Sequence, residues 1–138
     1  MSELAEHEVY AAIGEDGFRR LCAAFYQQIP GDDVLGPMYP PDDLAGAEQR
    51  LREFLIYRFG GPPDYLQHRG HPRLRLRHAP FAITAAARER WVELMDRAIA
   101  QADLPPPAAQ TLANFFAHMA TFLINRGDAA SGGTPLRD

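Results

Sequence analysis

The sequence predicts a single all-helical domain, and three observations support this prediction. Its 138 residues suit one domain, and 46% of them are hydrophobic, which is enough to build a core. Apolar residues recur with the helical period in four long stretches. The only alternating run, residues 73–77, would be a lone strand without a partner. We therefore expect an all-α fold built from four main helices.

The first two periodic stretches lie in the N-terminal half. The first follows Gly14 and ends at residues 30–31, where a Pro-Gly pair stops a helix. The second covers 44–58, with Asp42 or Asp43 as its N-cap. The buried face of the first helix is predicted to consist of Phe18, Leu21, Cys22, Phe25 and Ile29.

The other two periodic stretches lie in the C-terminal half. One opens at Thr84, which can act as an N-cap, and runs to about Ala102. The other follows the prolines at 105–107, which suit a first helical turn, and ends near 125–127. Its apolar face is predicted to hold Leu112, Phe115, Phe116, Met119, Phe122 and Leu123.

Three segments lack helical periodicity. Residues 32–39 have room for only a turn of helix, and residues 62–81 form a long stretch rich in Pro, Gly, Arg and His. Long irregular segments in compact domains are usually functional or disordered. The tail 127–138 is small, polar and Gly-rich, so we expect a folded domain over 1–126 followed by a disordered tail.

Composition excludes several classes of function. The net charge of −4 argues against nucleic acid as a partner, because such proteins need a concentrated basic face. No stretch approaches the roughly 18 apolar residues that span a membrane. The first eight residues are polar and acidic and do not resemble a signal peptide. We therefore expect a cytoplasmic protein with no membrane partner.

The irregular segment concentrates His68, His71 and His78. If 73–81 is a short helix, His78 shares an apolar face with Leu74 and Phe81. Arg73 and Arg77 then share the neighbouring face, where they repel each other unless an anion lies nearby. A haem meets both conditions, because it combines a large apolar ring and a metal centre with two carboxylates, and one neutral histidine commonly ligates it.

Two other interpretations of these histidines remain open. A histidine near apolar residues is usually an ordinary core or surface residue. The second interpretation is a zinc site built from His68, His71 and His78, although their spacing matches no strong zinc motif and no cysteine supports it.

Tyr26, Tyr39 and Trp91 each combine an apolar body with one hydrogen-bond donor. They are either ordinary aromatic residues of the core and its boundary, or donors arranged around a bound small ligand.

Two runs of sequence resemble the truncated haemoglobins, and most closely their second group. Residues 39–48 are similar to that group's entry into its distal helix, and residues 70–81 to its proximal segment. The glycines and proline at 60–62 and the Phe25-Tyr26 pair fit as well. The resemblance covers roughly residues 8–126.

The resemblance implies a two-over-two helical sandwich around a haem whose iron is ligated by His78. It implies that Tyr26, Tyr39 and Trp91 face the small ligand on the distal side. It places Arg50 and Arg77 at the haem propionates. The remaining pocket residues that it implies are Ala47, Leu51, Phe54, Leu74, Phe81, Ile83, Met95 and Met119.

The implied function is the binding of oxygen, and of nitric oxide or carbon monoxide, at a five-coordinate iron. Two or three hydrogen bonds from the distal donors are expected to slow oxygen release. The alternative is a haem-based redox enzyme, a peroxidase acting on peroxide or a nitric oxide dioxygenase. Because the sequence has no flavin or nicotinamide domain, that enzyme would need an external reductase.

Overall fold

The computed structural model describes residues 4–70, 72–74, 78 and 83–125, and every regular element within this part of the chain is a helix. The prediction of an all-α fold is confirmed. The four long helices are α1 (Val9–Gln27), α2 (Leu44–Arg58), α5 (Ala85–Gln101) and α6 (Pro106–Phe122). The short helices whose bounds are described are η1 (Glu6–Glu8), η2 (Gly36–Met38) and α3 (Asp64–Arg69).

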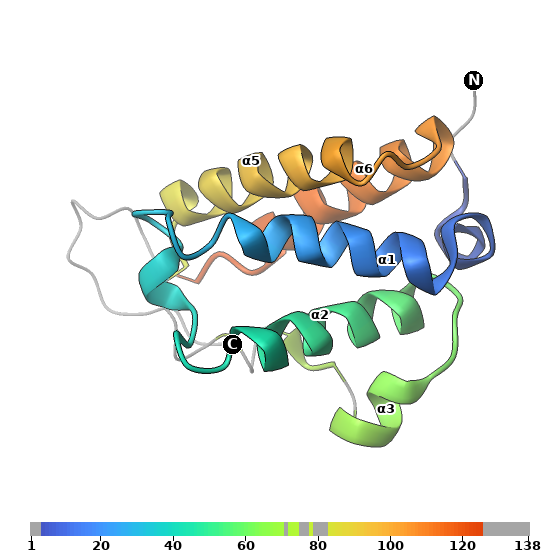
Figure 1. The fold of residues 1–138 in the computed structure, drawn as a ribbon, viewed down its shortest axis with the longest axis horizontal. Coiled ribbons are helices and arrows are strands. Elements are labelled where there is room, and N and C mark those ends of the chain that lie inside the picture. Colours follow the sequence, from blue (N-terminus) through green and yellow to red (C-terminus); the bar gives the residue numbers. More distant parts are fainter. Residues whose placement is uncertain (1–3, 71, 75–77, 79–82, 126–138) are drawn as a thin grey trace.

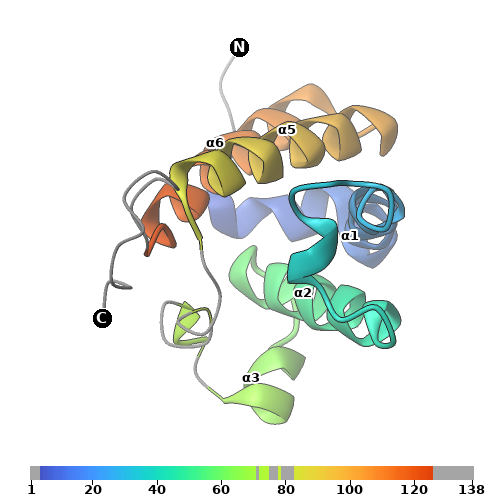
Figure 2. The same cartoon turned by 90° about the vertical axis from the view of Figure 1, so that its left-hand side faces the viewer.

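The long helices form two layers. Helix α1 packs against both α2 and α5, and α5 packs against α6. Figures 1 and 2 show the α5–α6 pair lying over the α1–α2 pair, with α3 beside α2. This is the two-over-two arrangement that the resemblance implies.

The core forms where the apolar faces of the two layers meet. All five apolar positions predicted for the first helix are buried, with at most 1% of each residue exposed. The ring of Phe59, at the end of α2, lies 6.0 Å from that of Phe18 and 4.9 Å from that of Phe115 on α6. Aromatic contacts of this kind join α1, α2 and α6 into one core.

Helix α1 begins earlier than the sequence predicts. It starts at Val9, and Gly14 interrupts it with φ 67° and ψ −178°. A positive φ is easily reached only by glycine, so the chain can change direction here without strain. The predicted helix after Gly14 corresponds to the longer second part of α1.

Helix α3 lies in the segment that we expected to be irregular. Prolines at 62 and 63 precede it, and Gly70, with φ 74°, follows it. These residues favour a helix start and a helix stop. However, its six residues are too few to reveal a helical period. The predicted turn of helix within 32–39 is present as η2.

The boundaries of the other long helices agree closely with the predicted boundaries, and the differences concern capping and exposure at the helix ends. Thr84 caps α5, and its side chain accepts a hydrogen bond from the backbone N–H of Ala87 at 3.1 Å. Asp43 occupies the N-cap position of α2 but makes no such bond. Helix α6 ends at Phe122, which is 51% exposed although it belongs to the predicted apolar face.

Some predictions fall outside the described residues, namely those on His71, Arg77, Phe81 and the tail 127–138. Among the helices that are described, none has the length and apolar character needed to cross a membrane.

Candidate functional site

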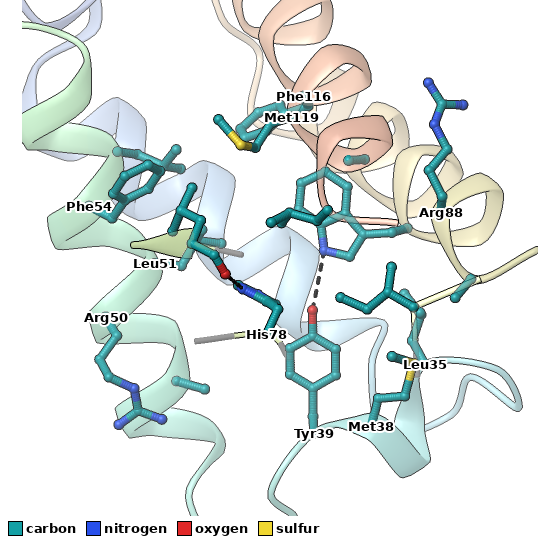
Figure 3. Close-up of a pocket in the computed structure, with 18 of the residues that line it drawn as sticks. Leu35, Met38, Tyr39, Arg50, Leu51, Phe54, His78, Arg88, Phe116 and Met119 are labelled. Carbon is teal, nitrogen blue, oxygen red and sulfur yellow. Dashed lines mark hydrogen bonds between the residues drawn. The ribbon is translucent and has the colours of Figure 1, made fainter. Parts of the chain in front are cut away.

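A cavity of about 460 Å³ lies between the helix layers. Sites for small molecules and cofactors usually measure about 300–1,000 Å³ and are mostly apolar. Figure 3 shows Leu51 and Phe54 entering it from α2, and Phe116 and Met119 from α6. The predicted pocket residues that line it are Ala47, Leu51, Phe54, Leu74, Ile83 and Met119.

His78 is half-buried and also lines this cavity. Its Nδ1 atom lies 2.7 Å from the backbone oxygen of Leu74. A carbonyl oxygen can only accept, so Nδ1 carries the hydrogen and donates it. In the neutral ring, Nε2 then carries the lone pair. A hydrogen bond at one ring nitrogen that prepares the other for a metal is the usual arrangement of a ligating histidine.

Tyr39 and Trp91 meet at the cavity. The indole Nε1–H of Trp91 donates to the hydroxyl oxygen of Tyr39 at 3.2 Å (Figure 3). Because the Tyr39 oxygen accepts this bond, its own hydrogen remains to be donated to another group. Burial raises the pKa of Tyr39 to about 12, despite the opposing effect of the Trp91 N–H. The Tyr39 hydroxyl therefore keeps its proton at neutral pH.

Tyr26 lies beside this pair and is 8% exposed. Its ring packs edge-on against that of Tyr39, with ring centres 5.6 Å apart. Its hydroxyl donates to the backbone oxygen of Ala47 over a longer distance of 3.3 Å. Burial raises its pKa above the usual range. The structure thus brings together all three predicted donors, although Tyr26 already has a backbone acceptor.

A partly buried ion pair fixes the turn that leads to Tyr39. Asp32 is 6% exposed and receives a hydrogen bond from the Nε of Arg90 at 2.5 Å. Its other carboxylate oxygen accepts from the backbone N–H groups of Leu35 and Val34, at 2.8 and 3.1 Å. Burial alone would raise the pKa of Asp32, but these hydrogen bonds and the Arg90 charge outweigh it and lower the pKa.

The Asp32–Arg90 pair has a direct bearing on the site. Arg90 is the residue before Trp91 on α5, and the turn that Asp32 stabilises continues into Met38 and Tyr39. The pair therefore links the segment that precedes Tyr39 to the helix that carries Trp91. The sequence did not predict it, because the two residues are 58 positions apart and neither belongs to a recognisable motif.

Basic residues accompany the apolar lining. Arg50, Arg69 and Arg88 line the cavity, and no acidic residue is among its described lining residues. Arg50, which was predicted, makes a partly exposed ion pair with Asp43 at 3.3 Å. Arg88 instead binds α6, donating to the backbone oxygen of Ala117 and to the Thr121 hydroxyl. Arg69 and Arg88 were not predicted.

The structure departs from the predicted pocket at Met95. This residue is 0% exposed in the closed core and does not line the cavity. Conversely, three lining residues in or just after α6 were not assigned to the pocket, although two of them, Phe116 and Leu123, were predicted on its apolar face: Phe116, Ala120 and Leu123. They share one helix face with Met119, but periodicity alone does not show which part of an apolar face meets a cavity. Tyr65 was missed because α3 itself was missed.

The zinc interpretation receives no support from the described residues. His68 is exposed and its Nδ1 pairs with Glu53 at 3.0 Å, and it does not line the cavity with His78. Within 4–70, 72–74, 78 and 83–125, no group of three potential metal-ligating residues occurs.

The residues present fit a haem. The cavity is apolar, which suits the macrocycle, and Nε2 of His78 carries a lone pair suited to iron. The arginines of the lining suit the two carboxylates of the cofactor.

This combination of fold and cavity is that of a globin. A sequence model of the bacterial-like globins matches residues 8–125, so the chain belongs to the bacterial-like globin family. Within that family it is one of the group 2 truncated haemoglobins. It is 32% identical over 120 residues to the group 2 truncated hemoglobin YjbI of Bacillus subtilis, covering 87% of this chain and 90% of that protein.

Solved structures agree with this assignment. The hemoglobin of Chloroflexus aurantiacus is 42% identical, with a TM-score of 0.82, over 86% of this chain and 98% of the other. The group II truncated hemoglobin of Bacillus anthracis is 29% identical, with a TM-score of 0.84, over 91% and 96%. Globins bind haem, so the predicted cofactor is confirmed, and they bind small diatomic ligands such as oxygen.

Proposed function

We propose that this chain binds haem through Nε2 of His78, and that it binds oxygen in the same cavity and releases it slowly. One observation carries the proposal. A single cavity brings together a histidine in the metal-binding tautomer and a hydrogen-bonded Trp91–Tyr39 pair. When bound, the haem supplies an iron with an open coordination position for a small ligand.

The chain's own residues hold and shield the cofactor. The Leu74 carbonyl orients the His78 ring through Nδ1 and makes Nε2 a better electron donor. Leu51, Phe54 and Met119 exclude water from the apolar part of the cavity. The guanidinium group of Arg50 can pair with a propionate. It then gives up its ion pair with Asp43, which is partly exposed and contributes little to stability. Arg77 stays a predicted second partner of the propionates, and Phe81 a predicted wall residue.

The Trp91–Tyr39 pair provides the donor for the small ligand. Trp91 polarises the Tyr39 hydroxyl by donating to its oxygen, which makes that hydroxyl a stronger donor. A net hydrogen bond contributes roughly 1 kcal/mol, and more when charge is involved. Because about 1.4 kcal/mol corresponds to a factor of ten, such donors slow release substantially. The oxygen-avid truncated haemoglobin of Bacillus subtilis, 32% identical with a TM-score of 0.81, supports this view.

Nitric oxide and carbon monoxide are further ligands that the same cavity would accept. The peroxidase and nitric oxide dioxygenase alternatives, the external reductase and the cytoplasmic location stay predictions. No feature of the described residues favours the redox alternatives over ligand binding.

The test is the oxygen dissociation rate of the ferrous protein, measured by rapid mixing with carbon monoxide as the replacing ligand. We expect slow release from the native chain and release about tenfold or more faster from Tyr39→Phe, which keeps the ring and loses the hydroxyl. Equal rates in the two proteins would refute the role of the pair.

A further inference from the structure

Asn125, just beyond α6, is a buried polar residue that makes three hydrogen bonds. It is 4% exposed. Its side-chain Nδ2 donates to the backbone oxygen of His78 at 3.2 Å, and its Oδ1 accepts from the backbone N–H of Ile83 at 3.0 Å. Its own backbone N–H donates to the oxygen of Ile83 at 2.9 Å.

The partners determine the orientation of this amide. A carbonyl must meet the NH₂ group and a backbone N–H must meet the oxygen, so the reverse orientation would lose both bonds. Both bonds are long-range, linking residues 47 and 42 positions apart. Removing a buried partner leaves unsatisfied groups, which costs more than the bond itself contributes.

The position of Asn125 connects two parts of the cavity wall. His78 and Ile83 both line the cavity, and so do Met119 and Leu123 near the end of α6, whereas Asn125 does not. The bond that His78 Nδ1 donates to the Leu74 carbonyl acts on the imidazole ring and spans only four residues. The bond from Asn125 acts on the backbone of His78 and comes from the segment that follows α6.

We propose that Asn125 is the positioning residue of His78: it holds the histidine backbone at a fixed place relative to α6 and so sets the direction from which Nε2 approaches the iron. This inference rests on the proposed function, because it takes His78 as the iron ligand. It goes beyond that function by assigning a role to a residue that touches neither the cofactor nor its ligand.

The test uses Asn125→Asp and Asn125→Leu in the full haem-loaded chain. The Asp side chain can still accept a hydrogen bond from the Ile83 N–H, but it places a carboxylate oxygen against the His78 carbonyl oxygen, and the two repel. The Leu side chain is similar in size and makes no hydrogen bonds. Asn114→Asp is the matched control, since it adds the same charge at an exposed position of α6 that does not line the cavity. The readouts are the iron–histidine stretching band in resonance Raman spectra and the rate of haem transfer to an acceptor apoprotein.

We expect both Asn125 variants to shift or broaden the iron–histidine band and to lose haem about tenfold faster. Asn114→Asp should match the native protein in both readouts. An unchanged band in both variants would overturn the proposal, even if their thermal unfolding temperature fell, because that result would show a purely structural role. If Asn125→Leu does not fold, the band of Asn125→Asp decides.

Failure of this inference can be told apart from failure of the proposed function. If His78→Gly keeps the native iron–histidine band, then His78 is not the ligand and the proposed function fails. If that band is lost in His78→Gly but is native in both Asn125 variants, only the role of Asn125 is refuted.

Discussion

The region around Tyr39 and Trp91 and the region around His78 are held in different ways. The first is embedded in aromatic packing and stabilised by the partly buried Asp32–Arg90 ion pair. His78 is held by hydrogen bonds to the Leu74 carbonyl and from the Asn125 amide. A region held by packing keeps its structure when one polar atom is removed, whereas a region held by a few hydrogen bonds is disturbed when one of them is lost. Substitutions near Tyr39 should therefore change ligand release, and substitutions near His78 should change haem retention.

The largest effect is expected at His78. His78→Gly removes the proposed iron ligand and should weaken haem binding strongly, so the purified protein should show little or no Soret absorption. Adding imidazole, which can occupy the vacated space, should restore a haem spectrum. A Soret band of native intensity in His78→Gly without imidazole would contradict the assignment.

The next effect is expected at Trp91. Trp91→Phe removes the N–H that donates to Tyr39 and keeps an aromatic ring in the wall. Oxygen dissociation should accelerate by about fivefold, less than in Tyr39→Phe because the hydroxyl itself remains, while the rate of haem loss stays within about twofold of the native rate. If Trp91→Phe lost haem quickly but released oxygen at the native rate, this region would control haem retention and not ligand release, which would contradict the comparison.

A smaller effect on release is expected at Asp32. Asp32→Asn keeps the shape of the side chain but removes the charge that Arg90 and two backbone N–H groups stabilise. It should lower the free energy of unfolding by about 2 kcal/mol and speed oxygen release a few-fold, because the turn leading to Tyr39 is less well fixed. Chemical denaturation and stopped-flow kinetics measure the two effects. Asp33→Asn, at an exposed neighbour, is the control.

The lowered pKa of Asp32 predicts how the stability of the protein depends on pH. Because the pKa of Asp32 is lower in the folded chain than its usual 3.8, the ion pair stabilises the protein fully above that pH. Its contribution is lost as the pH falls through the lowered folded pKa. The difference in stability between the native chain and Asp32→Asn should therefore shrink below about pH 3.8. A constant difference across that range would show that the Asp32 charge is not the source of the stabilisation.

The smallest effect is expected at Tyr26. Its hydroxyl already donates to the Ala47 backbone oxygen, at 3.3 Å, so Tyr26→Phe should speed oxygen release only about two- to threefold. An effect larger than that of Trp91→Phe would show that Tyr26, and not the Tyr39–Trp91 pair, is the main donor.

The sequence predicted what depends on local pattern. The four long helices, the buried face of α1 and the Thr84 cap follow from spacing and from single residues with known preferences. The chemistry of the residues made His78 and the three aromatic residues candidates, and the resemblance assigned their roles; the structure places all four at one cavity. Met95, which the resemblance also implies as a pocket residue, is buried in the core and does not line the cavity.

What the sequence did not reveal depends on contacts between distant residues. Asp32 and Arg90, or Asn125 and His78, become neighbours only after the helix layers have packed. Asn125 also looked like an ordinary helix end, since asparagine is common there. Helix α3 was missed for a local reason, because six residues carry too little periodicity.

The most direct test of the Tyr39–Trp91 pair is the oxygen dissociation rate of the double variant Tyr39→Phe/Trp91→Phe, compared with both single variants. If Trp91 acts by polarising the Tyr39 hydroxyl, the double variant should release oxygen at about the rate of Tyr39→Phe alone, because Trp91 has lost the group through which it acts. Effects that multiply, so that the double variant is faster by the product of the two single changes, would contradict this mechanism.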